Sequence, residues 1–176
     1  MTTVGTVQVV HALATSGHVD LPDHESWPEI ARCLVAFGGH WPAAIDLAAL
    51  STASPAQVDE AVARLAEQTG RELGERPAPH FWDTVCGLVA RSWRLGLFTE
   101  RDATCCMNRI WYEIRDLDRS ASQDLQIIWQ GMGLWELDEH SDQSRAMVDL
   151  LIGADRLIPA DAVDGPTCKA VLDAIG

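Results

Sequence analysis

The chain has 176 residues, of which 47% are hydrophobic and 22% are charged, and these values fit one globular domain and exclude a disordered chain. It carries 26 acidic residues against 13 basic ones, a net charge of -13, and Lys169 is its single lysine. Proteins that bind nucleic acids draw affinity from Lys and Arg side chains that neutralise phosphates. We therefore expect no nucleic-acid partner.

The sequence also gives expectations about the cellular location of the protein and about cofactors. No run of about 18 apolar residues could span a bilayer, and the first residues lack the basic stretch that precedes the apolar run of a secretory signal. We therefore expect a cytoplasmic protein without a membrane partner. The five cysteines are odd in number and show no Cys-x-x-Cys spacing, which favours reduced structural thiols over a metal or redox centre. No cofactor is expected.

Helical periodicity and capping signals account for the first part of the chain. Apolar spacing favours a helix over residues 7–17, although the β-branched residues between 4 and 10 leave a short strand as an alternative. Ser26 and Glu29 have the spacing of a capping box, which predicts a helix over residues 27–37 that the following two glycines end.

The next helices are predicted from proline and glycine signals. Pro42 stands where a helix begins, and the apolar pattern continues it to about Leu50. Ser54 and Gln57 form a second capping box, which opens a helix that Gly70 is expected to stop. Residues 72–79 then form a proline-containing linker, which offers a subdomain boundary near residues 72–80.

Residues 81–117 predict a helical hairpin that lies at the centre of the fold. Gly96 suits the left-handed residue that ends the first helix, and Thr99 with Asp102 caps the second. The apolar stripe of the second helix is widened by Met107 and Trp111, so we expect that helix to be covered on more than one side.

Three more helices are predicted toward the end of the chain, over residues 120–133, 141–153 and 164–175, with Gly133 and Gly153 as stops. The predicted fold is therefore all-α, with about eight short helices packed as helical hairpins. Residues 1–176 are expected to form a single domain, because each half alone would make a small core.

Residues 45–70 resemble the helix-turn-helix half of winged-helix DNA-binding proteins. In that family the second helix enters the major groove, but here the matching positions hold three acids and one arginine, and no basic wing follows. Plain packing of two helices is therefore favoured over a winged-helix transcription regulator. The matching positions are Gln57, Asp59, Glu60, Arg64 and Glu67.

Two loops combine histidine with carboxylates, which are ligands of zinc, iron and manganese. Neither loop has two ligands at helical spacing, so solvated loop residues are favoured over a metal site. His11, His40 and His80 are candidate general bases, but no catalytic spacing surrounds them. The loops contain His18, Asp20, Asp23, His24 and Glu25, and Glu136, Asp138, Glu139, His140 and Asp142.

A row of carboxylates lies close to a large aromatic side chain between residues 135 and 142. Charges of this kind steer a basic partner toward the surface, and an aromatic residue anchors it. The alternative is a solvated loop with the tryptophan in the core. The candidate partner-binding residues are Trp135, Glu136, Asp138, Glu139 and Asp142.

An acidic, all-helical chain of this length without catalytic motifs resembles the immunity proteins of bacterial toxin–immunity systems. The segment Trp41 to Leu65, followed by the hairpin that Phe81 and Trp82 open, is similar to helical proteins from such systems. The resemblance implies a binding module that inhibits a toxin domain with a basic surface through an acidic face. A small helical enzyme, either metal-dependent or cofactor-free, with a His/Asp site or a Trp-lined pocket, is the alternative.

Overall fold

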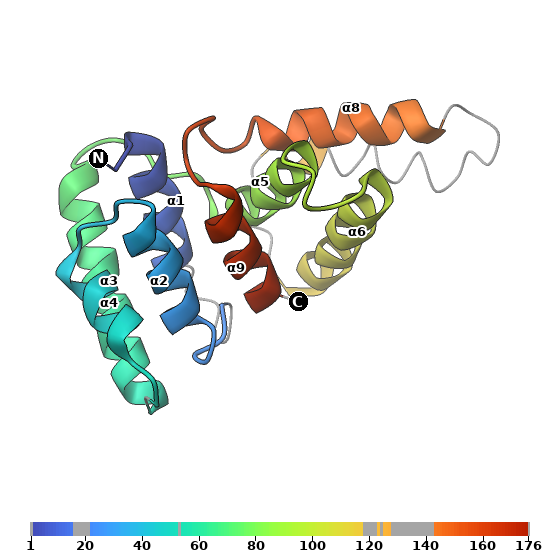
Figure 1. The fold of residues 1–176 in the computed structure, drawn as a ribbon. Helices are drawn as coiled ribbons and strands as arrows, with labels where there is room; N and C mark the ends of the chain where they lie inside the picture. The colour runs from blue at the N-terminus through green and yellow to red at the C-terminus, as the bar shows by residue number, and fades with distance from the viewer. Residues whose placement is uncertain are drawn as a thin grey trace. The chain divides into compact units, whose positions relative to one another are not determined.

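Every regular element of the described chain is an α-helix, and no strand occurs among the described residues (Figure 1). The predicted all-α class is therefore confirmed. No helix in the described part of the chain is both long and apolar enough to cross a membrane. The computed structural model describes residues 2–15, 22–52, 54–117, 123, 125–127 and 143–175.

The helices divide into two compact units. The first unit comprises residues 1–81 and 159–176, and the second comprises residues 82–158. Whether the chain folds as one domain stays a prediction. The first unit holds α1 (Val4–Ala14), α2 (Trp27–Ala36), α3 (Pro42–Ala49), α4 (Pro55–Leu73) and α9 (Gly165–Ile175), and the second holds α5 (Phe81–Arg94) from Trp82 onward, α6 (Glu100–Leu117) and α8 (Gln143–Asp155).

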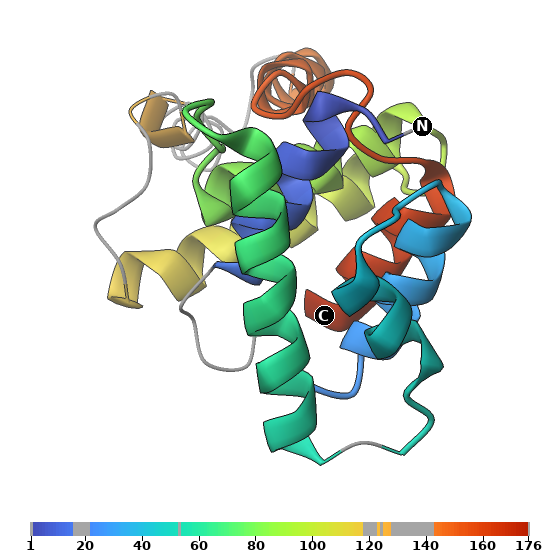
Figure 2. The same cartoon turned by 90° about the vertical axis from the view of Figure 1, so that its left-hand side faces the viewer.

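In the first unit, α2 packs between α3 and α9, and α4 packs against α1 and α3 (Figures 1 and 2). Each helix turns one apolar stripe toward the others, and complete burial of one such side chain stabilises the fold by roughly 1.5–3 kcal/mol. Side chains from all five helices are at most 1% exposed, among them Val9, Ile30, Leu34, Leu47, Leu65 and Val171.

The first element is a helix and not a strand. Its β-branched residues Val7, Val9 and Val10 are buried, and the helix packs along α4. This packing outweighs the weak preference of valine for strands. Thr3 caps the helix by accepting the N–H of Thr6 at 3.1 Å.

The two predicted capping boxes have different outcomes. The box at Ser54 and Gln57 is confirmed, since the Ser54 N–H donates to Oε1 of Gln57 at 3.0 Å. The box at Ser26 and Glu29 is wrong, because Ser26 makes no side-chain capping bond. Its N–H instead donates to Oδ1 of Asp23 at 2.7 Å, so the loop before α2 supplies the carboxylate.

Gly70 does not end α4, contrary to the prediction. The helix continues to Leu73, and Gly74 takes the left-handed conformation with φ of 60°. A Cβ atom on Gly70 would lie 3.0 Å from Cε1 of His11, so this glycine allows α1 to approach α4 closely. Similarly, α8 continues past Gly153 to Asp155.

The turn between α5 and α6 follows the prediction. Gly96 has φ of 73°, and Oγ1 of Thr99 accepts the N–H of Asp102 at 3.1 Å. Residues 81–92 of α5 are all buried. Over its described side chains, residues 100–110, α6 buries Met107 and Ile110 and exposes Arg101 and Arg109, and Trp111 lies outside the described side chains, so the predicted coverage of α6 on more than one side stays a prediction.

A buried ion pair joins α5 to the end of α8 within the second unit. Nε of Arg91, a residue that is 1% exposed, lies 2.6 Å from Oδ1 of Asp155. Nη1 of Arg94 lies 2.9 Å from the other oxygen of the same carboxylate. Both arginines therefore pair with the same carboxylate, and loss of that carboxylate would remove one counter-charge from a buried guanidinium.

We predict that Asp155→Ala destabilises the protein by about 3 kcal/mol, because breaking a buried ion pair costs more than removing a carboxylate from a helix C-terminus gains. Urea unfolding followed by circular dichroism measures the effect. Asp149→Ala, at an exposed position of the same helix, is the matched control and should change stability by less than about 0.5 kcal/mol. Equal stabilities of the two variants would contradict the prediction.

Candidate functional site

All five residues that the sequence suggested for partner binding lie outside the described residues; they are Trp135, Glu136, Asp138, Glu139 and Asp142. His18, Asp20 and His140, from the two loops considered as metal ligands, also lie outside them. Asp23, His24 and Glu25 of the first loop are described, and His24 and Glu25 line a cavity in the first unit.

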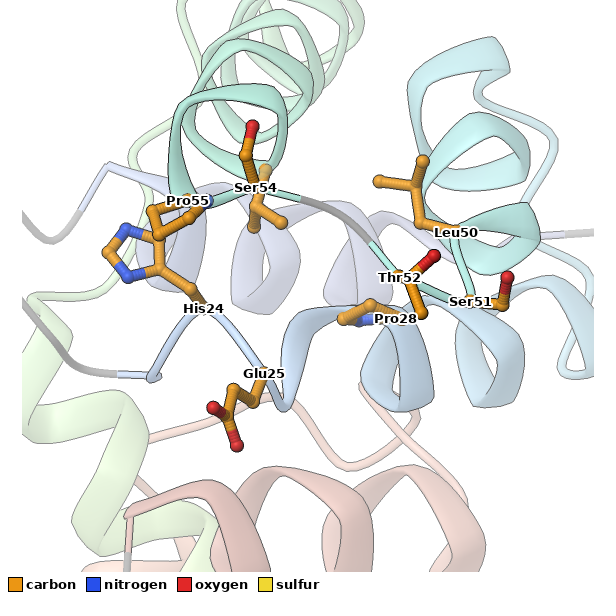
Figure 3. Close-up of a pocket in the computed structure, with 9 residues that line it drawn as sticks. His24, Glu25, Pro28, Leu50, Ser51, Thr52, Ser54 and Pro55 are labelled. Carbon is orange, nitrogen blue, oxygen red and sulfur yellow. The ribbon is translucent and has the colours of Figure 1, made fainter.

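The cavity has a volume of about 610 Å³ and lies where the loop before α2 meets the turn between α3 and α4 (Figure 3). His24 and Pro55 lie on one side of it in this view, and the α3–α4 turn lies on the other. Hydroxyl and apolar side chains both line it. The lining residues are His24, Glu25, Pro28, Leu50, Ser51, Thr52, Ser54, Pro55 and Val58.

Two helix starts form the walls of the cavity. Pro28 lies in the first turn of α2 and Pro55 in the first turn of α4, where the missing N–H of proline removes no helical hydrogen bond. The cap from Asp23 to Ser26 and the capping box at Ser54 fix the entry of the chain into each helix. Both walls are therefore set by local sequence.

His24 links the two walls. Its Nε2 atom lies 2.7 Å from Oδ1 of Asp59 on α4, and the two side chains are 32% and 66% exposed. A pair this exposed stabilises a fold by about 1 kcal/mol at most. The contact therefore positions the loop against α4 more than it holds the unit together.

Exposed carboxylates lie in the two segments that form the cavity. Glu25 lines it, Asp59 pairs with the lining residue His24, and Asp23 and Glu60 are the sequence neighbours of His24 and Asp59; we call these four carboxylate residues the acidic rim. In Figure 3 the side chain of Glu25 extends away from the α3–α4 turn. Among the described residues, no Lys or Arg lines the cavity. The site therefore has a negative potential, which favours a cationic ligand over an anionic one.

The helix-turn-helix positions form an exposed face of α4. Gln57, Asp59, Glu60, Arg64 and Glu67 are all exposed, as that arrangement requires. Nη1 of Arg64 lies 3.0 Å from Oδ2 of Asp46 on α3, so the carboxylate offsets the charge of the arginine. This pairing weakens the attraction that a phosphate would feel. The exclusion of nucleic acid stays a prediction.

The candidate general bases lie in packing contacts. Nδ1 of His11 is 3.1 Å from the carbonyl oxygen of Ala66, and the ring of His40 stacks on Trp41 with centroids 5.6 Å apart. His80 is exposed just before α5. In the described part of the chain, no three His, Cys, Asp or Glu side chains are grouped in a way that could hold a metal ion.

The cysteines are free thiols, and burial governs their chemistry. Burial and, to a lesser extent, the nearby Asp83 raise the pKa of Cys86. Burial also raises the pKa of Cys33 and of Cys106. Because the thiolate is the nucleophile, a raised pKa keeps these three groups protonated and unreactive at neutral pH.

We predict that a thiol reagent at neutral pH labels Cys105 first, because it is the exposed cysteine, and labels Cys86 and Cys168 only after unfolding. Raising the pH should accelerate labelling of Cys33 and Cys106 as their thiolate fraction grows. Mass spectrometry of a labelling time course measures the order. Cys105→Ser should lose the fastest phase, and rapid labelling of Cys86 in the folded protein would contradict the assignment.

Comparison of the chain with protein-family models, with curated proteins and with solved structures finds no match. No relative therefore supplies a function for the cavity or for the fold. The function has to be inferred from the chemistry of the residues themselves, and the resemblance to immunity proteins continues only as part of a proposal.

Proposed function

We propose that this chain is a protein-binding module, most concretely an immunity or inhibitor protein that neutralises a basic toxin or enzyme through an acidic face. The observation that carries the proposal is the exposed acidic rim beside a cavity whose described lining residues include no Lys or Arg. The net charge of -13 indicates that the whole chain, and not only the rim, favours a positively charged partner. A cationic protein surface is the partner that this charge favours.

Ion pairing reduces the positive charge of the surface further. Several described basic side chains contact a carboxylate, so their charge is largely cancelled at short range. The acids outside these pairs set the long-range potential, which raises the rate at which a basic partner associates. The paired basic residues at the surface are Arg32, Arg64, Arg71, Arg94 and Lys169.

The segment from Trp135 to Asp142 is the second element of the proposed interface, and its role rests on the sequence. A tryptophan buries a large area at low entropic cost, and neighbouring carboxylates steer the encounter. A basic nuclease uses its cationic surface to bind phosphates, so a protein that covers this surface with carboxylates blocks the substrate. This chemistry supports inhibition as the outcome of binding.

The test exchanges Asp138 and Glu139 for lysine and measures binding to the protein encoded beside this chain. We expect the dissociation constant to rise by about tenfold or more, and its salt dependence to become weaker, because two steering charges are reversed. Isothermal titration calorimetry at low and at physiological salt gives both quantities.

The matched control is the double variant Glu75→Lys and Asp149→Lys, which changes the net charge equally at two exposed positions. It should raise the dissociation constant less than the first variant does. Equal effects would remove residues 136–142 from the interface. A neighbouring protein that is itself acidic, or that does not bind, would contradict the proposed function.

A further inference from the structure

We propose that the cavity beside the acidic rim receives an arginine side chain of the partner. This inference rests on the proposed function and names the group that the described surface recognises. It concerns a place on the molecule that is separate in sequence from residues 136–142. Three properties of the cavity support it: apolar walls, hydroxyl groups and a negative rim.

The apolar walls suit the aliphatic part of an arginine side chain. Pro28 and Leu50 are half-buried, and Val58 is 1% exposed at the cavity lining. Arginine carries a stem of three methylene groups that packs on apolar surface while its charged end stays near water. An open cavity of about 610 Å³ has room for one such side chain and for the water around its charged end.

The hydroxyl groups suit the charged end. Ser51 and Thr52 are exposed in the α3–α4 turn and line the cavity, so their oxygens are available as acceptors. Ser54 contributes less, because its Oγ already lies 3.2 Å from Oε1 of Gln57. A guanidinium offers five N–H donors in a plane and is less strongly hydrated than an ammonium group, so this mixed lining favours arginine over lysine.

The charges decide against an anion, even though two helices begin at the cavity. Each helix N-terminus acts as roughly half a positive charge. At the start of α2, Asp23 accepts the N–H of Ser26, and its carboxylate offsets the partial positive charge of that helix N-terminus. Asp59 and Glu60 lie in the first turns of α4 and offset the partial charge there. Four carboxylates of the rim exceed the two partial charges even when His24 is protonated. A cation is therefore the favoured occupant.

The experiment uses N-acetyl-arginine methylamide as the probe and follows the amide resonances of the isotope-labelled full chain by NMR. We expect saturable shifts confined to residues 24–28 and 50–58. The lysine analogue should bind several-fold more weakly, and the glutamate analogue should not shift these residues. Shifts spread over the acidic surface without saturation, or local shifts with the glutamate analogue, would overturn the inference.

Two variants and a control make the assignment specific. Thr52→Trp, at an exposed position, should fill the cavity and abolish the local shifts while the rest of the spectrum stays folded. Glu25→Gln should weaken binding about threefold, as removal of one exposed charge does, whereas Glu75→Gln should not change it. Unchanged binding by Thr52→Trp would show that the probe binds elsewhere, which contradicts the proposal.

The outcomes for the cavity and for the proposed function can be distinguished. If the neighbouring protein binds the wild-type chain and Thr52→Trp equally while the arginine probe leaves the cavity unshifted, the cavity assignment is wrong and the binding function stands. If the arginine probe binds in the cavity but no basic protein associates, the proposed function is wrong, and with it the role assigned to the cavity.

Discussion

A shortage of positive charge is the constraint on which the structure and the proposed function both depend. In the second unit, Arg91 and Arg94 of α5 are both paired with a carboxylate, that of Asp155. On the surface, arginines of α2 and α4 contact acids on the same or the next helix. With 26 acids and 13 bases in the chain, such pairing leaves carboxylates in excess. The interactions that stabilise the helices thus also make the outer surface attractive to cations.

The helical class of the elements could be predicted from the sequence. The positions of the helix ends could not, because a glycine can either end a helix or lie inside it at a contact with another helix. The pair Gly38 and Gly39 ends α2 as predicted, with Gly38 at φ of 108°. Gly70 has the same sequence signal for a helix stop, but it lies inside α4 against the ring of His11, where a Cβ atom would be 3.0 Å from Cε1. Glycine suits both a helix end and a close approach of two helices, and the local sequence does not distinguish them. The difference is set by packing between α1 and α4, helices far apart in the sequence.

Only part of the candidate site could be predicted from the sequence, for a similar reason. His24 belongs to a candidate metal-binding loop and Ser54 to a helix cap, and each pattern is local. No local pattern links them, because the contact between His24 and Asp59 spans 35 residues. Pro28 belongs to no motif in the sequence, and Leu50 and Thr52 fall in the segment that resembles a helix-turn-helix, which gives no indication of a cavity. An arrangement of hydroxyls and apolar side chains becomes a binding surface only when the fold brings two loops together.

The position of that surface depends on segments distant from it. The wall that carries Pro28 belongs to α2, which packs against α9 near the end of the chain. The start of the chain is tied to the residues before α9, since Oγ1 of Thr3 donates to the carbonyl oxygen of Asp161 at 2.8 Å. A change in the packing of α9 therefore reaches the cavity through α2 without touching any residue that lines it. The cavity is in this sense a property of the whole first unit, because helices from both ends of the chain pack against the segments that form it.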